Sequence, residues 1–409
     1  MKITNYIVVL EQSADKFILL NPANAGTIRV SKEIYKKIKN NDIKQFTEAE
    51  IEFLQKAGFI GEDDFDEKLL NEVKSVYIDS SLNLVFMTSE NCNFRCSYCY
   101  ESHTNHHIER DVYDSALKLV NNSSKENLII NWFGGEPLLE VEDIEYFMKK
   151  VYDLKKFKSI NSSIITNGYL LTEKNFNKLI KANVKVFQIT LDGLKTEHDK
   201  QRYLKNGMGT FDRIVENLRY MKSTNEDFVV YLRYNYNEQS NPVEYVRYIK
   251  SLVGKDKRFV LDFHPIGDWS STNKGLPHAH HNDDIFIAKK DALESGMRIR
   301  NIEEDTCPAG YFCSAHRDEA YIINYKRDVM KCTIMLDWDK NIIGKLNKDG
   351  TIEFNDNYEL WHTPIHNEKC ATCNVRPVCM SKYCPHIDKN ACKETIEKKI
   401  KDVLEIKYV

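Results

Sequence analysis

No stretch of this sequence contains the roughly 18 to 20 consecutive apolar residues that cross a bilayer as a helix, so we expect no membrane anchor. The first segment, MKITNYIVVLEQ, lacks both the apolar length and the small-residue cleavage site of a signal peptide, which favours a cytoplasmic protein. An excess of one charge is also absent, since 58 basic and 61 acidic residues give a net charge of −3. Nucleic-acid binders place Lys and Arg against phosphates, so this balance argues against that class.

The sequence also lacks the even set of cysteines that is typical of a disulfide-stabilised secreted domain. It has 11 cysteines, unevenly distributed: three fall within eight residues, the next 207 residues contain none, and eight fall in the last 103. The eight are Cys307, Cys313, Cys332, Cys370, Cys373, Cys379, Cys384 and Cys392. Such clustering is typical of metal coordination, because several thiolates must converge on one centre.

The chain of 409 residues, 42% apolar, is long enough for two or three globular domains. Short apolar runs rich in β-formers, each followed by a helical stretch, lie at 82–87, 128–133, 162–166, 184–191, 229–234 and 259–263. Alternating strands and helices predict an α/β fold with a parallel sheet, and six units predict a partial (β/α)6 barrel. In such barrels the catalytic residues lie at the carboxyl ends of the strands. The first four predicted strands are followed by the motifs NCNFRCSYCY, GGEP, TNG and LDG. Asn235 and Asn237, near the end of the fifth run, fit caps of the strand and the next helix.

Residues 1–75 are expected to form a separate α+β unit. Apolar strands at 6–10 and 17–20 precede two helical segments. In the second, Thr47 and Glu50 predict a capping box and Gly58 predicts the helix end. The acidic stretch GEDDFDEK then marks the edge of the unit.

The spacing CxxxCxxC at Cys92, Cys96 and Cys99 offers three thiolates without a fourth nearby. A structural zinc site takes four protein ligands, whereas a 4Fe-4S cluster held by three cysteines leaves one iron open to another group. With Tyr98 just before the last cysteine, the sequence resembles the radical S-adenosylmethionine (SAM) superfamily. The resemblance implies that SAM binds the open iron, and that one electron cleaves it to methionine and a 5′-deoxyadenosyl radical that abstracts hydrogen from substrate. A zinc knuckle is the alternative.

Further motifs extend this resemblance to the SAM site. Gly134, Gly135 and Glu136 match the family's GGEP motif, in which the glycines let the backbone approach the ligand and the carboxylate receives the methionine ammonium. In ITLDG, Thr190 takes the place of the hydroxyl residue that meets the ribose.

An arginine of this family commonly pairs with the methionine carboxylate of SAM. Arg202, in HDKQR, and Arg213, in GTFDRI, are the candidates, with Arg213 preferred. A surface ion pair is the alternative for either.

The last cysteines resemble the SPASM extension, which typically holds two auxiliary 4Fe-4S clusters. The resemblance implies that Cys307, Cys313, Cys332 and Cys384 hold one cluster and that Cys370, Cys373, Cys379 and Cys392 hold the other. Three clusters would then use all 11 cysteines. The family usually has glycine where Arg327 stands and CxxxC where four residues separate Cys379 and Cys384, which leaves the role of Cys307 open. If Cys307 is not a ligand, an auxiliary iron is open to a substrate thiolate; a zinc ribbon is the rival reading.

Residues 1–75 resemble the PqqD-like, winged-helix recognition element of peptide-modifying enzymes, which binds the leader of a ribosomally made precursor peptide as an added strand. The alternative is a stabilising extension. The expected domains are therefore a leader-recognition unit at 1–75, a radical SAM core at 76–300 and a SPASM domain at 301–409. An electron donor such as flavodoxin or ferredoxin is the other implied partner.

The resemblance favours a radical SAM peptide maturase that joins a cysteine sulfur to a carbon as an intramolecular thioether. Carbon–carbon crosslinking or epimerisation shares the early steps. A sulfatase-maturating, formylglycine-forming enzyme shares the architecture, but that family typically has Gln before GGEP and Asp after the cysteine matched by Cys332, where this chain has Phe133 and Thr333. A non-catalytic iron–sulfur electron carrier or peptide-binding scaffold is the alternative from another class.

Overall fold

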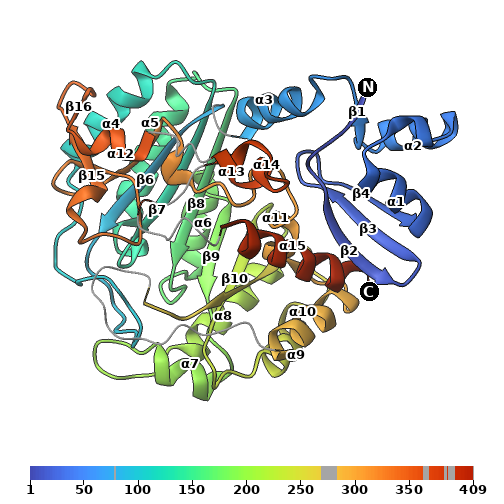
Figure 1. Ribbon diagram of the computed structural model, residues 1–409. Coiled ribbons are helices and arrows are strands. Elements are labelled where there is room, and N and C mark those ends of the chain that lie inside the picture. The colour runs from blue at the N-terminus through green and yellow to red at the C-terminus, as the bar shows by residue number, and fades with distance from the viewer. Residues whose placement is uncertain (78–79, 269–282, 363–367, 382–384, 386–391, 409) are drawn as a thin grey trace. The chain divides into compact units, whose positions relative to one another are not determined.

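The computed structural model describes residues 1–77, 80–268, 283–362, 368–381, 385 and 392–408 (Figure 1). It divides into two compact units. The first comprises 1–80, 301–318 and 362–409, and the second comprises 81–300 and 319–361. Residues 319–361 thus group with the barrel segment, and the two flanking parts of the C-terminal region group with the N-terminal segment. The three expected domains with borders at 75 and 300 remain a prediction.

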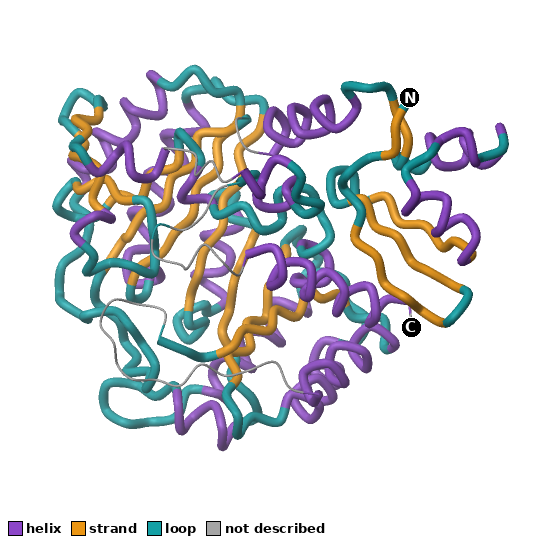
Figure 2. Tube along the Cα trace, in the orientation of Figure 1, coloured by secondary structure: helices purple, strands orange, loops and turns teal. Residues whose placement is uncertain are grey.

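The second unit is built on one mixed sheet of eleven strands among the described residues, drawn in orange in Figure 2. Its order is β12-β11-β10-β9-β8-β7-β6-β13-β14-β15-β16. The six predicted strands are β6 (Ser81–Ser89), β7 (Asn127–Gly134), β8 (Ser159–Thr166), β9 (Val186–Thr190), β10 (Val229–Tyr236) and β11 (Phe259–Pro265). They pair in parallel, as the alternating pattern predicts. The predicted α/β fold with a parallel core is confirmed.

Helices separate these strands along the chain. They are α4 (Arg110–Asn122), η2 (Pro137–Glu140), α5 (Val141–Asp153), α6 (Glu173–Lys181), α7 (Lys195–Gln201), α8 (Phe211–Ser223), α9 (Pro242–Val253) and α10 (Asp283–Glu294). Their starts follow local chemistry: Thr172 caps α6, and Asn241 caps α9 with Pro242 in the first turn. Each connection is long enough for the crossover that parallel strands require.

Five further strands extend both edges of the sheet. They are β12 (Arg298–Ile299), β13 (Ala320–Ile323), β14 (Asp328–Met330), β15 (Ile342–Leu346) and β16 (Ile352–Phe354). β13 pairs in parallel with β6, and the strands beyond it are antiparallel. The helix α12 (Asn357–His362) follows β16. The edge of the first barrel strand is therefore occupied by a segment that comes some 230 positions later in the chain.

Strand β10 shows how the sequence positions functional side chains. Its residues alternate between buried and half-buried, so Leu232, Tyr234 and Tyr236 lie on one face while Arg233 and Asn235 lie on the other. A strand projects successive side chains to opposite faces, which explains the alternation. The apolar face packs in the core, and the polar face is left for the site.

The first unit contains an antiparallel sheet of β2 (Val8–Ser13), β3 (Lys16–Asn21) and β4 (Gly26–Ser31), followed by α1 (Lys32–Asn40), η1 (Ile43–Gln45), α2 (Glu48–Lys56) and α3 (Phe65–Tyr77). A short pair joins β1 (Lys2–Ile3) to β5 (Ile60–Gly61). The capping box predicted at Thr47 and Glu50 is present at the start of α2. Gly58, just beyond α2, has a φ of 77°, and a Cβ there would overlap the side chain of Asn24.

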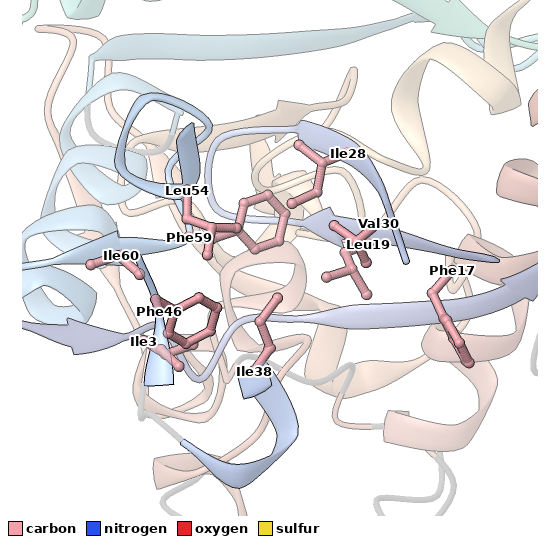
Figure 3. Close-up of a cluster of buried hydrophobic side chains, with 10 residues drawn as sticks. All are labelled: Ile3, Phe17, Leu19, Ile28, Val30, Ile38, Phe46, Leu54, Phe59 and Ile60. Atoms are coloured by element: carbon pink, nitrogen blue, oxygen red, sulfur yellow. The ribbon is translucent and has the colours of Figure 1, made fainter. Parts of the chain in front are cut away.

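Both faces of this small sheet are buried. Figure 3 shows one cluster, in which Phe17, Leu19, Ile28 and Val30 pack with side chains of the helical portion. On the opposite face, Val8, Ile18 and Leu20 pack with residues of 375–404, including Val378, Ile400 and Leu404. The later part of this unit comprises α11 (Arg300–Glu304, at the border), η3 (Ser314–His316), α13 (Glu368–Ala371), α14 (Arg376–Cys379) and α15 (Cys392–Tyr408). Burial on two faces explains why β3 is almost continuously apolar.

Candidate active site

The three clustered cysteines lie on the loop that follows β6, at the carboxyl end of the parallel sheet. Cys92 is buried, and Cys96 and Cys99 are half-buried. Main-chain bonds hold one side of this cysteine loop: Arg95 N donates to Tyr203 O at 2.8 Å and Ser97 N donates to Gln201 O at 2.9 Å. The loop is thus held by the segment after α7, although it has no regular secondary structure of its own.

The glycines of GGEP hold the other side of the cysteine loop. Gly135 N donates to Ser89 O at 2.7 Å, and Glu136 N donates to Asn91 O at 3.0 Å. A Cβ on Gly135 would lie 2.4 Å from Asn91 O, and one on Gly134, whose φ is 116°, would lie 2.4 Å from Ser89 O. The sequence analysis explained these glycines by the close approach of a ligand. The structure adds a second explanation, because only glycine lets β7 end this close to the cysteine loop.

Glu136 is fully buried and ties the ends of two strands together. Its carboxylate accepts from Leu138 N at 3.0 Å, Thr166 Oγ1 at 2.7 Å and Asn167 N at 2.8 Å. The Asn167 side chain in turn donates to Asn93 Oδ1 at 2.8 Å, beside Cys92. The structure thus connects the GGEP and TNG motifs directly to the cysteine loop. The expected contact of Glu136 with the SAM ammonium remains a prediction.

Tyr98 is the centre of a buried polar network. Its hydroxyl donates to Asp192 Oδ2 and accepts from Arg202 Nη1 at 2.7 Å and from Asn235 Nδ2 at 3.0 Å. Asp192 also accepts from Asn235 N at 2.8 Å, and the guanidinium of Arg202 lies 3.9 Å from its carboxylate. Burial raises the pKa of Asp192, and the charge of Arg202 opposes that rise. The network joins the cysteine loop to β9, β10 and the end of α7.

His198 binds the main chain of Asp192 and so supports this network. Its Nδ1 accepts the Asp192 N–H at 3.0 Å, so Nε2 carries the proton and faces Thr210 Oγ1 at 3.0 Å. Thr210 Oγ1 then donates to the carbonyl of Arg202 at 2.7 Å. Burial, with Arg202 nearby, holds the pKa of His198 well below its usual range, so the ring is neutral.

The structure separates the two candidate arginines. Arg202 is buried beside the cysteine loop, with its guanidinium 5.6 Å from the centre of the Phe94 ring. Arg213 lies on α8 with 39% of its side chain exposed and pairs with Glu216 one turn away. Arg202 is thus the candidate that lies beside the cysteine loop, and the pairing of either arginine with the SAM carboxylate remains a prediction. Thr190 is buried at the end of β9, opposite Arg233 of β10, so it does lie at this end of the sheet.

Sequence reasoning missed part of this site. Asp192 and Asn167 were inside quoted motifs but had no assigned role. Asn235 was expected only to cap, yet it donates to Tyr98, and Asn237 bonds within the turn at 237–240 while Asn241 caps the next helix. The alternation of polar residues along β10 was the available signal for Asn235.

The residues present fit an iron–sulfur cluster and SAM in their chemistry. Arg202 Nε and Asn93 Nδ2 are buried donors without a hydrogen-bond partner in the described part of the chain. Burial and the charges of Glu90 and Glu136 raise the pKa of Glu101 to about 8. Unpaired donors call for an anionic group such as a carboxylate, and crowded carboxylates favour a cationic ligand. SAM carries both kinds of group.

Within the described residues, no three His, Cys, Asp or Glu side chains form a group that could hold a metal ion. Burial, followed by the charge of Glu136, raises the pKa of Cys92 to about 12, so the free thiol is protonated at neutral pH. A metal takes the thiolate, so cluster binding at this position would release a proton.

The later cysteines lie in both units. Cys307, Cys313, Cys370, Cys373 and Cys379 belong to the first unit, where Ala309 N donates to Pro377 O at 2.9 Å and Tyr311 N to Val378 O at 3.1 Å. Those bonds align the two cysteine-bearing segments. Cys332 belongs to the second unit, Cys392 begins α15, and Cys384 lies outside the described residues. The two auxiliary clusters remain a prediction.

Arg327 stands where the SPASM family usually has glycine. Its φ is 63°, the left-handed region that glycine favours. The side chain donates to Ser115 Oγ at 2.7 Å and to the Asp111 carboxylate at 2.7 Å. Arg327 thus takes a backbone conformation that favours glycine, and contacts with α4 offset the strain.

Residues 86–239 match the family model described as Radical SAM superfamily. This segment is therefore similar to the radical SAM superfamily. The cysteine-type anaerobic sulfatase-maturating enzyme of Clostridium novyi (strain NT) is 26% identical over 333 residues, which is 73% of this chain and 86% of that enzyme. Among solved structures, anSMEcpe with bound AdoMet and Kp18Cys peptide matches 80% of this chain and 96% of that one, at a TM-score of 0.61 and 21% identity.

A second solved structure matches more of this chain. SuiB of Streptococcus suis bound to the precursor peptide SuiA covers 96% of this chain and 100% of that one, at a TM-score of 0.55 and 16% identity. At these identities the structural matches establish the fold. The segment that matches the family model runs from within β6 to just past β10, and so includes the cysteine loop, the glycines of GGEP and the Tyr98 network. No helix in the described ranges is long and apolar enough to cross a membrane.

Proposed function

We propose that this chain is a radical SAM enzyme that modifies a ribosomally made precursor peptide, and that the product is an intramolecular thioether between a cysteine sulfur and a carbon. The observation that carries the proposal is the cysteine loop, clamped between the GGEP glycines and the Tyr98 network at the carboxyl end of the sheet. Cys92, Cys96 and Cys99 would hold a 4Fe-4S cluster, with SAM beside Arg202. When bound, the cluster and SAM supply a radical that removes a hydrogen atom from the peptide.

Each protein group has a distinct task in this proposal. Arg202 and the Asn93 amide provide buried donors for the anionic end of SAM, and Glu136 fixes the loop that carries Cys92. Tyr98 is held by three partners, so it keeps the cysteine loop from swinging away from β9. Positioning of this kind lowers the reorganisation needed at the moment of reaction.

The likeness to SuiB supports a peptide substrate, since that structure holds a precursor peptide and its fold matches 96% of this chain. The first unit adds a physical reason. In the described residues β4 pairs only with β3, which leaves its outer edge without a strand partner, whereas β2 packs with α15. An extended leader peptide could add to β4 by main-chain hydrogen bonds, as PqqD-like elements do. An exposed edge strand is otherwise prone to wrong pairing.

Sulfatase maturation is the second candidate, favoured by the 26% identity to the Clostridium novyi enzyme. Two positions speak against it by resemblance. Phe133, where that family typically has Gln, is buried with Met87, Ile322 and Met330 and so offers no amide to the site. Thr333 follows Cys332, where the family has Asp, so the chain lacks that carboxylate.

Mass spectrometry after anaerobic reconstitution with dithionite, SAM and a cysteine-containing precursor peptide tests the chemistry. A thioether or a carbon–carbon crosslink makes the peptide lighter by two hydrogen atoms, and fragmentation separates the two by whether the cysteine is consumed. An unchanged mass with 5′-deoxyadenosine formed would indicate epimerisation, which deuterium uptake from solvent reveals. Loss of the cysteine sulfur would indicate formylglycine. Absence of 5′-deoxyadenosine with clusters intact would refute the enzyme proposal.

Amide hydrogen exchange tests the leader site without altering the chain. We expect a leader-bearing peptide to slow exchange in 26–31, while the leaderless core peptide, as the matched control, leaves that segment unchanged. Backbone N–H groups that gain a strand partner exchange more slowly. Binding of the leader without protection in β4 would place the recognition site elsewhere.

A further inference from the structure

A short hairpin covers the outer side of the cysteine loop. Residues 201–209 run beside 93–97, with Lys205 N donating to Asn93 O at 3.0 Å and Phe94 paired with Leu204 in an antiparallel bridge. Tyr203 and Gly209 form the bridge that closes the hairpin. At its tip Met208 is 59% exposed. We call 91–98 together with 200–209 the basic hairpin surface.

This surface carries charge of one sign. Its two segments contain four basic residues and no acidic residue, in a chain whose net charge is −3. Arg202 is buried, while Lys200 and Lys205 are exposed and Arg95 is half-buried. Arg95 donates to the carbonyls of Cys92 at 2.9 Å and Phe94 at 2.6 Å, so a cation lies against the main chain of the first cysteine.

Of the four basic residues, Arg202 lies 3.9 Å from the buried carboxylate of Asp192, whereas the two carboxylates that flank the hairpin in the sequence do not pair with its exposed lysines. Asp199 accepts from the main-chain N–H groups of Thr210 and Phe211 at 2.7 and 2.9 Å. Asp212 pairs with Lys195. Both carboxylates are therefore engaged, and neither is paired with Lys200 or Lys205.

A cavity of about 310 Å³ opens at the same place. It is lined by Asn91, Asn93, Leu139, Leu204, Lys205 and Asn206. Two of these residues flank Cys92 directly in the sequence. A group seated in the cavity would therefore lie next to the main chain of Cys92, with apolar side chains below it and a lysine at its rim.

We propose that the basic hairpin surface is the docking site of an acidic one-electron carrier protein. The proposal rests on the proposed function, because radical SAM chemistry needs an electron from outside the chain. The step transfers a single electron from the reduced carrier to the iron–sulfur group, so the carrier is oxidised by one electron and no bond forms or breaks. Redox partners typically meet over small surfaces, steered by opposite charge. The exposed Met208 supplies the apolar contact that such a small interface needs.

The test is a binding titration with a flavodoxin, a small acidic one-electron carrier, against the reconstituted enzyme. Lys200→Glu combined with Met208→Glu should weaken binding about tenfold or more, and raising the salt concentration should weaken wild-type binding, because both act on charge steering. The matched control is Lys149→Glu, which changes the charge of an exposed lysine on α5, outside the basic hairpin surface. This variant should bind flavodoxin within about twofold of wild type. Equal binding by the double variant and wild type would overturn the proposal.

Cleavage of SAM provides the second readout. Cleavage driven by reduced flavodoxin should fall in the double variant in step with binding, and cleavage driven by dithionite should stay at the wild-type rate. An equal fall with both reductants would show that the substitutions disturb the cysteine loop, which overturns docking as their role. No cleavage by wild type with dithionite would refute the proposed function instead, and the titration would still decide the docking site.

Discussion

Replacing Gly135 with alanine tests whether the GGEP glycines position the cysteine loop. The new Cβ would lie 2.4 Å from Asn91 O and 2.8 Å from its carbonyl carbon, both main-chain atoms that cannot rotate away. The loop must move by at least 0.6 Å, since real Cβ contacts essentially never fall below 3.0 Å. Overpacking of this kind costs about 1–3 kcal/mol, and weakening the two adjoining main-chain bonds adds about 1 kcal/mol each. We expect a total of about 3–5 kcal/mol.

The displacement should affect function more than folding. A misplacement of about 1 Å at a reacting centre can lower a rate on the order of 10²-fold, so cleavage of SAM with dithionite should fall by about that factor. Iron per chain and 5′-deoxyadenosine are the measurements. The control is Gly296→Ala, whose φ is 78° but whose Cβ would meet nothing within 4 Å, so only backbone strain of about 1–2 kcal/mol arises. A Gly135→Ala protein with wild-type iron content and cleavage would refute the positioning role.

Three further predictions concern the ligands of the site. Replacing Arg202 with methionine leaves the buried Asp192 without its cation, so we expect a loss of about 3–5 kcal/mol in stability and of SAM binding in equilibrium dialysis. Arg213→Met should keep both, and equal effects of the two variants would contradict the assignment. Cys92→Ala should abolish 5′-deoxyadenosine formation with dithionite; wild-type formation would mean that the cluster is held elsewhere. Cys370→Ala should retain part of that cleavage and yield no modified peptide by mass spectrometry, and parallel loss of both in a folded protein would argue against separate roles.

The order of strands and helices could be read from the sequence because each βα unit is a local pattern. The Tyr98 network could not. Its hydroxyl meets Asp192, Arg202 and Asn235, which follow it by 94, 104 and 137 positions. Their meeting depends on the register of β9 against β10, in which Thr190 lies opposite Arg233. Register is a property of the folded sheet, and no short motif encodes it.

The different environments of the two arginines could not be read from the sequence for a related reason. Only 11 positions separate Arg202 from Arg213, and both follow the same strand. Arg202 ends α7 and is turned into the site, whereas Arg213 starts a helix whose apolar side packs inward and whose charged side faces solvent. Helix phase decides burial, and the boundary between α7 and α8 is the kind of detail that sequence patterns leave open.

The grouping of 319–361 with the barrel was also beyond the sequence. The strand at 320–323 looks like the start of a new domain, but it pairs in parallel with β6. The edge strand of a sheet has unpaired main-chain groups that any other strand can bind. A strand from late in the sequence can therefore pair with the edge of a strand from early in the sequence. The spacing of the cysteines predicts which of them bind the same cluster. It does not predict how the segments that carry them divide between the two units.

The small sheet of the first unit has consequences for how the chain is made and altered. Val8, Ile18 and Leu20 are buried against residues that follow them by about 380 positions or more, such as Ile400 and Leu404. During translation this apolar face stays uncovered until those later residues have emerged, which makes it a natural site for chaperone capture. For the same reason, deleting 1–75 would strip one side of a core that the last segments need. Moving the first unit into another protein would therefore require moving both of its parts, 1–80 and the later segments, together.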